Sequence, residues 1–416
     1  MTPKISTLTG HAVMALCFMA AGDLDDGITH ADTAGQAIDI MNDTELTDRL
    51  EAVAWTVAAD IYGGRYLTSA RRAARGVALA RASGRTHLLL HLLVRHGSAL
   101  RMTGRLNEAR TCLEEACNMG QGAAGEHLTV TAHIELARVT LLQGEVLRAL
   151  QLAEAAVKLA GEFSRSAVEA RTMLGHARFA ANDVPGCLEH VTAAGGGADL
   201  PLIERLSRPA EYELLTRAAL AEADTALAQQ WAGQALAAVD HSSHPTATAY
   251  AALADSHTLL ALGDTGASVS RALAAVDGFK RASNRVELGR ARMALGKARA
   301  ADGHRKEAAD ELRAAVDDFS HCGAPRLEDE ATRELRRLGV KVARAAGRGL
   351  PAGGVVSLSR RELEVAEHVA RGLTNREVAA WMYLSEKTVE RHLSSIFMKL
   401  GVRSRVALAL ELRPSA

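Results

Sequence analysis

Hydrophobic and small residues recur along the chain at helical spacing, and no alternating run of β-branched residues reaches the length of a strand. Turn-forming residues return about every forty positions. They are Gly22, Gly64, Gly104, Gly144, Asn182, Ala223, Gly263 and Gly303, separated by 38 to 42 residues. A fixed period of this size is typical of stacked helical units. The pattern therefore predicts an all-α solenoid.

Small side chains fill three further columns of the repeat. Five positions after each turn stand Gly27, Ser69, Ala109, Ala149, Cys187, Ala228, Ser268 and Ala308. Twelve positions after it stand Ala34, Gly76, Ala116, Ala156, Ala194, Ala235, Ala275 and Ala315. Seven positions before it stand Ala15, Val57, Gly97, Ala137, Gly175, Thr216, Ser256 and Gly296, of which only Val57 is bulky. Because two helices joined by a short turn approach closely only where side chains are small, each repeat is predicted to be a helical hairpin.

Residues 5 to about 322 would hold about eight such hairpins. The columns resemble those of tetratricopeptide repeats, although the period exceeds 34 residues and the family's Trp, Tyr and Pro positions are mostly missing. The resemblance implies a tetratricopeptide-like α-solenoid. Pro325 is predicted to open a capping helix that runs to about Val342, and Gly195 to Gly197 are interpreted as a flexible connector.

Composition narrows the class of protein. Lys plus Arg and Asp plus Glu are both 49, and alanine makes up about a fifth of the chain, which suits close helix packing. Five scattered cysteines form no CxxC pair, which argues against disulfides and structural zinc and favours a reducing cytoplasm. The apolar stretch from His11 to Ala21 is too short to span a bilayer, and we assign it to the first hairpin instead of a signal peptide. No membrane association is expected.

The forty-residue repeat ends before a segment that is predicted to be a linker. Residues 343–356, ARAAGRGLPAGGVV, contain four glycines and a proline, so a domain boundary is predicted between residues 1–342 and residues 357–416. The second segment carries a net charge of +3 and the rest of the chain −3. The net charge of zero for the whole chain thus conceals a modestly basic C-terminal segment.

Capping residues divide this module into helices. Ser359 with Glu362 and Thr374 with Glu377 have capping-box spacing, Gly372 is a left-handed helix end, and Ser385 is an N-cap. They predict helices at residues 359–371, 374–382, 386–400 and 404–412. Only three residues separate the middle two, which is a helix-turn-helix arrangement.

The third of these helices has two faces. The buried stripe is predicted to consist of Val389, Leu393, Ile396, Phe397 and Leu400. The opposite, polar face is predicted to consist of Glu390, Arg391, Ser394, Ser395 and Met398. Such a face can enter the major groove of DNA, where Arg391 would bond guanine and Glu390 would accept from cytosine. Phosphates would meet Lys399, Arg403, Arg405 and the amides at Thr374.

The segment from Leu358 to Ala409 resembles the LuxR/GerE-type helix-turn-helix domain of bacterial transcription regulators. The resemblance rests on RExEV from Arg361, GxTNxEVA from Gly372, SxxTV from Ser385 with His392, and KLxV from Lys399. It implies base contacts at Glu390, Arg391 and Ser394. It implies phosphate contacts at Thr374, Asn375, Thr388 and Lys399, and dimerisation through the fourth helix, Ser404 to Leu412. Many members carry Lys where Glu390 stands, which puts the operator preference in doubt.

The whole layout is similar to the C-terminal part of large ATP-binding LuxR regulators related to the maltose activator. Those proteins carry an ATPase module first. Here Gly296-Lys297 is followed by Ala298, so no phosphate-binding loop is present, and no strand-helix alternation indicates a phospho-receiver domain. Control by ATP is not predicted, and no cofactor is expected.

Two other groups of residues are weaker candidates. His87 and His91 have i,i+4 spacing and His96 nearly shares their face, but without a third ligand we favour ordinary array histidines over a zinc site. His241, Ser242, Ser243 and His244 resemble an inter-repeat loop, and no GxSxG elbow supports a hydrolase. Neither an enzyme nor a metal site is predicted.

The sequence predicts a cytoplasmic bacterial transcription regulator that binds double-stranded operator DNA as a homodimer. Its solenoid would bind an unknown protein partner or small effector, and RNA polymerase is a further candidate partner. The alternative is a repeat scaffold whose terminal domain serves docking or dimerisation. A third hypothesis is that the chain is a shortened relative or a piece of an ATPase regulator. Activator and repressor roles both remain open.

Overall fold

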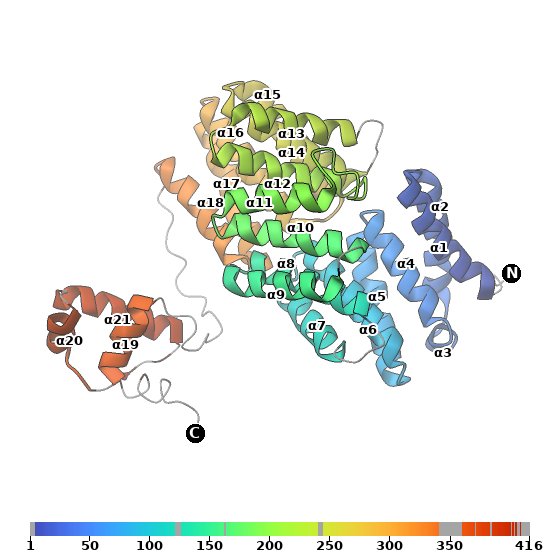
Figure 1. The fold of residues 1–416 in the computed structure, drawn as a ribbon, viewed down its shortest axis with the longest axis horizontal. Coiled ribbons are helices and arrows are strands. Elements are labelled where there is room, and N and C mark those ends of the chain that lie inside the picture. The colour runs from blue at the N-terminus through green and yellow to red at the C-terminus, as the bar shows by residue number, and fades with distance from the viewer. Residues whose placement is uncertain are drawn as a thin grey trace. The chain divides into compact units, whose positions relative to one another are not determined.

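The computed structural model describes most of the chain as helices (Figure 1). The residues described are 5–120, 126–161, 164–239, 244–340, 360–370, 372–382, 385–400, 402, 404–405 and 408. Within these ranges there is no strand. The backbone contacts divide the chain into two compact units, Met1–Lys341 and Val342–Ala416. The predicted linker at residues 343–356 lies outside the described residues. None of the described helices is long and apolar enough to cross a bilayer.

Among its described residues, the first unit contains eight helical hairpins, as the period predicts. The first helices of the hairpins are α1 (Ile5–Ala21), α4 (Leu50–Tyr62), α6 (Thr86–Met102), α8 (Glu126–Leu142), α10 (Arg165–Ala180), α12 (Arg208–Ala221), α14 (Pro245–Ala261) and α16 (Arg285–Ala301). The second helices are α2 (Leu24–Ile40), α5 (Tyr66–Ala82), α7 (Leu106–Met119), α9 (Val146–Ala160), α11 (Val184–Gly195), α13 (Thr225–Ala238), α15 (Thr265–Arg281) and α17 (Arg305–Cys322). We call this unit the solenoid.

The hairpin turns share one backbone conformation. All eight predicted turn residues have a positive φ, including the non-glycine residues Asn182 (φ 64°) and Ala223 (φ 57°). A left-handed residue at this point ends one helix and redirects the chain into the next. Six of the eight positions are glycine because glycine adopts this conformation without a steric penalty.

The three columns of small residues lie where the helices cross, and every member is buried. Glycines in the column before the turn have no room for a side chain. A Cβ atom on Gly97 would lie 2.5 Å from Cγ of Leu113, and one on Gly175 would lie 2.5 Å from Cγ2 of Val191. The close approach of the two helices therefore depends on the missing side chain.

Two helices fall outside the hairpins. α3 (Asp43–Thr47) is a short helix that the period did not predict, and it starts with a capping box between Asn42 and Glu45. α18 (Pro325–Arg337) is the predicted capping helix, although it ends five residues earlier than Val342 because Gly339 turns the backbone to a φ of +75°. Its Leu335 is buried.

The glycine run after α11 is packed, which corrects the interpretation as a flexible connector. Gly196 and Gly197 have positive φ, and the Leu202 amide donates a hydrogen bond to the Gly195 carbonyl (3.0 Å). Leu200 is completely buried beside α11 and α12. The segment is ordered because apolar residues just beyond the glycines fill the core.

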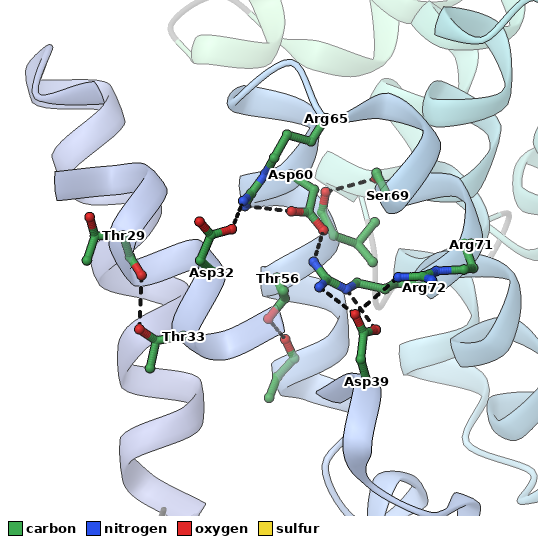
Figure 2. Close-up of polar contacts among 12 residues, drawn as sticks. Thr29, Asp32, Thr33, Asp39, Thr56, Asp60, Arg65, Ser69, Arg71 and Arg72 are labelled. Atoms are coloured by element: carbon green, nitrogen blue, oxygen red, sulfur yellow. Dashed lines mark hydrogen bonds and ion pairs between the residues drawn. The ribbon is translucent and has the colours of Figure 1, made fainter. Parts of the chain in front are cut away.

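The first and second hairpins meet through ion pairs. Figure 2 shows Asp60 of α4 between Arg65 and Arg72, which also reach the acidic side chains of α2. Arg72 donates to Asp60 (2.7 Å) and to Asp39 (2.8 Å), and Arg65 also pairs with Asp32. Asp60 is 0% exposed and Arg72 only 8%. Buried charges of this kind are tolerated because each is paired.

The first helices of neighbouring hairpins contact one another. Hairpins that are about five repeats apart also contact each other. His244, just before α14, donates a hydrogen bond from Nε2 to the carbonyl of Tyr62 (2.8 Å), and Tyr66 and Thr246 bond through their hydroxyls (3.0 Å). Gly144 similarly lies against Arg326 of α18. Successive superhelical turns therefore touch, which an array with contacts only between neighbouring repeats would not do.

Candidate nucleic-acid interface

The second unit contains the three described helices α19 (Arg360–Ala370), α20 (Asn375–Met382) and α21 (Glu386–Leu400), close to the predicted bounds. They surround one apolar core. Its buried residues are Val365, Ala366, Val369, Val378, Ala379, Met382, Val389, Leu393, Ile396, Leu400 and Leu408. The predicted stripe of α21 is confirmed, with Phe397 half-buried at its edge. Most of the predicted fourth helix lies outside the described residues. We call this unit the C-terminal domain.

Hydrogen bonds fix the start of α20 as predicted. Glu377 accepts from the amide and the hydroxyl of Thr374 (both 2.7 Å), and its own amide donates to the Thr374 hydroxyl (3.3 Å). These hydrogen bonds from Thr374 lower the pKa of the Glu377 carboxyl. Gly372, with a φ of +91°, ends the preceding segment. The capping box and the left-handed glycine are both confirmed.

The start of α21 has a simpler cap. The Thr388 amide donates to the Ser385 hydroxyl (3.1 Å), which confirms Ser385 as N-cap. The two hydroxyl groups also bond each other (2.7 Å), so Thr388 is half-buried against its own helix start. Tyr383 and Leu384, in the turn before Ser385, lie outside the described residues.

The outward face of α21 presents Glu390, Arg391 and Ser394, all exposed. The hydroxyl of Ser394 donates to the Glu390 carbonyl one turn earlier (2.9 Å), a common position for a helical serine at a solvated surface. The side chains of Lys399 and Arg403, the predicted phosphate contacts, lie outside the described residues. The structure thus brings the three candidate base contacts onto one face.

Ser395 was predicted on this polar face, and the structure corrects that prediction. Ser395 is half-buried and donates to the carboxylate of Glu362 on α19 (2.7 Å). Thr388 and His392 are half-buried too, at helical spacings of seven and three residues from Ser395. The flank of α21 that carries these residues turns toward α19, and the available polar face is narrower than the sequence pattern suggested.

Arg405 contacts the start of α20. It donates to the Leu373 carbonyl (3.0 Å) and to the side-chain oxygen of Asn375. A guanidinium group therefore lies beside Thr374 and Asn375, two of the predicted phosphate contacts. The sequence indicated Arg405 as a phosphate contact but gave no signal for its pairing with Asn375, because thirty residues separate them.

Family comparison identifies the C-terminal domain. Residues 356–412 match the luxR family of bacterial regulatory proteins. The C-terminal domain is a LuxR-family helix-turn-helix domain. Relatives include the nitrate/nitrite response regulator protein NarP of Escherichia coli, 43% identical over 53 residues that cover 13% of this chain and 25% of NarP.

Two further relatives are described as transcriptional regulators. The probable HTH-type transcriptional regulator GfsR of Streptomyces halstedii is 48% identical over 61 residues, which cover 15% of this chain and 25% of GfsR. The putative HTH-type transcriptional regulator Mb0914c of Mycobacterium bovis is 36% identical over 108 residues, which cover 24% of this chain and 11% of Mb0914c. The matched segments thus span a quarter or less of the length of each of these relatives.

The solenoid resembles a solved structure. A Rap protein, crystallised with competence and sporulation factor, aligns with 80% of this chain and 97% of its own, with a TM-score of 0.51 and 12% identity. At this identity the likeness concerns the fold alone. It agrees with the tetratricopeptide-like architecture that the small-residue columns indicate.

The remaining sequence candidates lie in the solenoid. His91 packs edge-on against Trp55 at 5.6 Å between ring centres, and burial lowers the pKa of His91 to about 4. His96 bonds the thiol of Cys112 (3.6 Å). Among the described residues no three His, Cys, Asp or Glu side chains gather as a metal site. His241, Ser242 and Ser243 lie outside the described residues, whereas His244 caps α14 by accepting from the Ala247 amide (3.1 Å).

Proposed function

We propose that this chain is a transcription regulator that reads DNA with α21 and receives its signal through the solenoid. The observation that carries the proposal is the exposed set Glu390, Arg391 and Ser394 on the second helix of a LuxR-family helix-turn-helix domain. An arginine on such a face can bond guanine O6 and N7, and a glutamate can accept from the cytosine amino group.

Phosphate contacts would hold the domain in register on the duplex. Thr374, Asn375 and Arg405 gather at the start of α20, where helix amides favour an anion. Thr388, Lys399 and Arg403 are proposed to contact phosphates as well. One such domain covers one half-site, so tight binding calls for a homodimer on a roughly twofold operator.

The solenoid is proposed to bind a protein partner or small effector on its inner face. Binding there would shift the equilibrium between DNA-binding and non-binding states of the dimer, provided that the effector prefers one of them. The Rap protein shares the fold, and its crystal structure in complex with competence and sporulation factor supports a binding role for such an array.

Selection from random duplex oligonucleotides by the purified full chain tests the DNA-binding half. We expect enrichment of a roughly twofold motif with half-sites about one helical turn apart. Affinity for the selected site must fall steeply as salt rises, because phosphate contacts release counterions. Binding without sequence preference would overturn the proposed regulator.

A docking scaffold is the second candidate function. Trp381 on α20 is 70% exposed, and the acidic residues Glu386 and Glu390 lie exposed on α21. An exposed tryptophan is typical of a protein contact, and acidic residues oppose a phosphate backbone. DNA binding that is absent, or insensitive to salt, together with dimerisation through this domain would favour the scaffold.

A further inference from the structure

A cleft of about 430 Å³ lies at the first two turns of α4, α6 and α8 in the solenoid. Its lining also includes the residue that ends α3 and the residue that precedes α6. The lining residues are Asp48, Glu51, Trp55, Arg85, His87, Leu88, His91 and Leu128. The volume falls in the range of about 300–1,000 Å³ that is typical of small-molecule sites. Because three successive hairpins contribute, a molecule bound here would contact all of them.

One part of the lining is apolar. Trp55, Leu88 and Leu128 are half-buried and pack against a hydrophobic core of the solenoid. The ring of His91 meets that of Trp55 edge-on, with 5.6 Å between the ring centres. Burial lowers the pKa of His91 to about 4, so its imidazole is neutral near pH 7. This part of the cleft therefore suits an apolar or aromatic group.

The other part of the lining carries charges that do not balance. Asp48 and Glu51 are exposed carboxylates, and Arg85 donates a hydrogen bond to Asp48 (3.1 Å). The charges of Asp48 and Arg85 are therefore matched. Within the part of the chain that the structure describes, the Glu51 carboxylate has no ion-pair or hydrogen-bond partner.

Glu51 lies beside the apolar part of the cleft. It belongs to the first turn of α4, where the helix favours a negative side chain. Trp55 follows four residues later, so the two side chains are neighbours on one face of α4. The cleft thus places an unmatched negative charge next to an indole ring.

This combination defines a class of ligand. A carboxylate forms charge-assisted hydrogen bonds with an ammonium group, and the face of an indole ring attracts a cation. We propose that the cleft binds a small molecule whose ammonium group pairs with Glu51 and whose apolar body lies against Trp55. The inference rests on the proposed role of the solenoid as the sensing half, and it names the chemical class of the effector.

Thermal unfolding of the full chain tests the ligand class with two matched probes. Phenethylamine hydrochloride and sodium hydrocinnamate carry the same phenethyl group with opposite charges, and sodium chloride at equal ionic strength is the reference. We expect phenethylamine to raise the unfolding midpoint by roughly 2 °C or more and hydrocinnamate to leave it unchanged. Stabilisation by hydrocinnamate, with or without phenethylamine, or by neither probe would overturn the proposal.

Glu51→Gln tests the charge, because glutamine keeps the length of the side chain and removes the negative charge. Isothermal titration should show an affinity for phenethylamine that is lower by roughly threefold or more. The matched control is Glu154→Gln on α9, which removes an exposed glutamate and changes the net charge equally. The control should bind phenethylamine like the wild type. Equal affinities for the two variants would overturn the proposal.

Tryptophan emission locates the bound amine. The chain has three tryptophans, of which Trp231 is buried and Trp381 is exposed on the C-terminal domain. We expect phenethylamine to change the emission of the wild type and of Trp381→Phe, but not of Trp55→Phe. An emission change that persists in Trp55→Phe would place the amine elsewhere and overturn the proposal.

These measurements separate the cleft from the proposed regulator, because no DNA is present in them. Failure of the chain to bind DNA would leave a positive result with phenethylamine intact. A chain that selects an operator but does not bind phenethylamine would overturn only the ligand class proposed for the cleft.

Discussion

At the scale of single residues, the position of a residue on its helix decides whether its side chain packs in the core or faces the solvent. Val389 and Leu393 are buried in the domain core, and Glu390, Arg391 and Ser394 between or beside them are exposed. The periodicity of the sequence predicted this division. It misplaced Ser395 because the face of a helix does not reveal which flank a neighbouring helix covers.

Substitution of Arg391 is predicted to change sequence preference. Arg391→Ala should weaken binding to the preferred operator by about 1–3 kcal/mol, through loss of the contact with a base edge, and hardly affect unrelated DNA. Lys399→Ala should instead weaken binding to every sequence and reduce the dependence on salt. Fluorescence anisotropy on operator and scrambled duplexes measures both. Equal losses on both duplexes for Arg391→Ala would contradict its assignment.

The buried carboxylate of Asp60 is predicted to matter for stability. Asp60→Ala removes the carboxylate that Arg72 and Arg65 share, although each keeps its pair with Asp39 or Asp32, and should lower the free energy of unfolding by about 1–3 kcal/mol. Asp310→Ala removes an exposed pair with Arg313 and should cost less than about 1 kcal/mol. Urea unfolding followed by circular dichroism compares the two. Similar small losses would show that the buried pairs of Asp60 in Figure 2 contribute little to stability.

At the scale of elements, the hairpin is defined by small residues at its crossing and a left-handed residue at its turn. Both were readable from the sequence because they repeat about every forty positions. The short helix α3 was missed because it lies between hairpins and occurs once. The connection after α11 was misread because glycines suggest freedom, whereas Leu200 packs into the core.

Two glycine substitutions within helices should have opposite effects. Gly97→Ala places a Cβ atom against Leu113 and should destabilise the solenoid by about 1–3 kcal/mol. Gly233→Ala meets open space on α13 and should stabilise it by up to about 1 kcal/mol, since alanine favours helix. Thermal unfolding followed by circular dichroism distinguishes them. Stabilisation by Gly97→Ala would refute close packing at this crossing.

At the scale of the whole molecule, hairpins that are far apart in the chain pack against each other where successive superhelical turns meet. They join Tyr62 to His244 and Tyr66 to Thr246, about 180 residues apart in the chain. No periodicity within one repeat indicates which repeats will meet after a full turn.

Acid should loosen these long-range contacts. Burial lowers the pKa of His244 to about 4, below the ordinary 6.5, so the unfolded chain binds the proton more tightly. The stabilisation from neutral His244 is therefore complete above about pH 6.5 and is lost as the pH falls toward 4, at roughly 1.4 kcal/mol per pH unit at most. His91 adds a contribution of the same sign.

His244→Asn tests this pH dependence. Asparagine can still cap α14 through its side-chain oxygen, but it does not titrate and is too short for the contact with the Tyr62 carbonyl. We expect a variant that is less stable at pH 7 and whose unfolding free energy falls less steeply between pH 6.5 and 4. An unchanged slope would show that His244 does not contribute to the acid sensitivity.

The sequence alone determined the repeat, the hairpin turns, the helix-turn-helix with its caps and its outward residues, because these depend on spacings within about forty residues. Tertiary structure decided the pairing of Ser395 with Glu362, the contact of Arg405 with Asn375 and the closure between superhelical turns. Such contacts join side chains that are distant in the chain. Which side chains meet depends on the angles at which helices cross and on the rise of the superhelix per turn. The spacing of residues within one repeat indicates neither the crossing angles nor the rise.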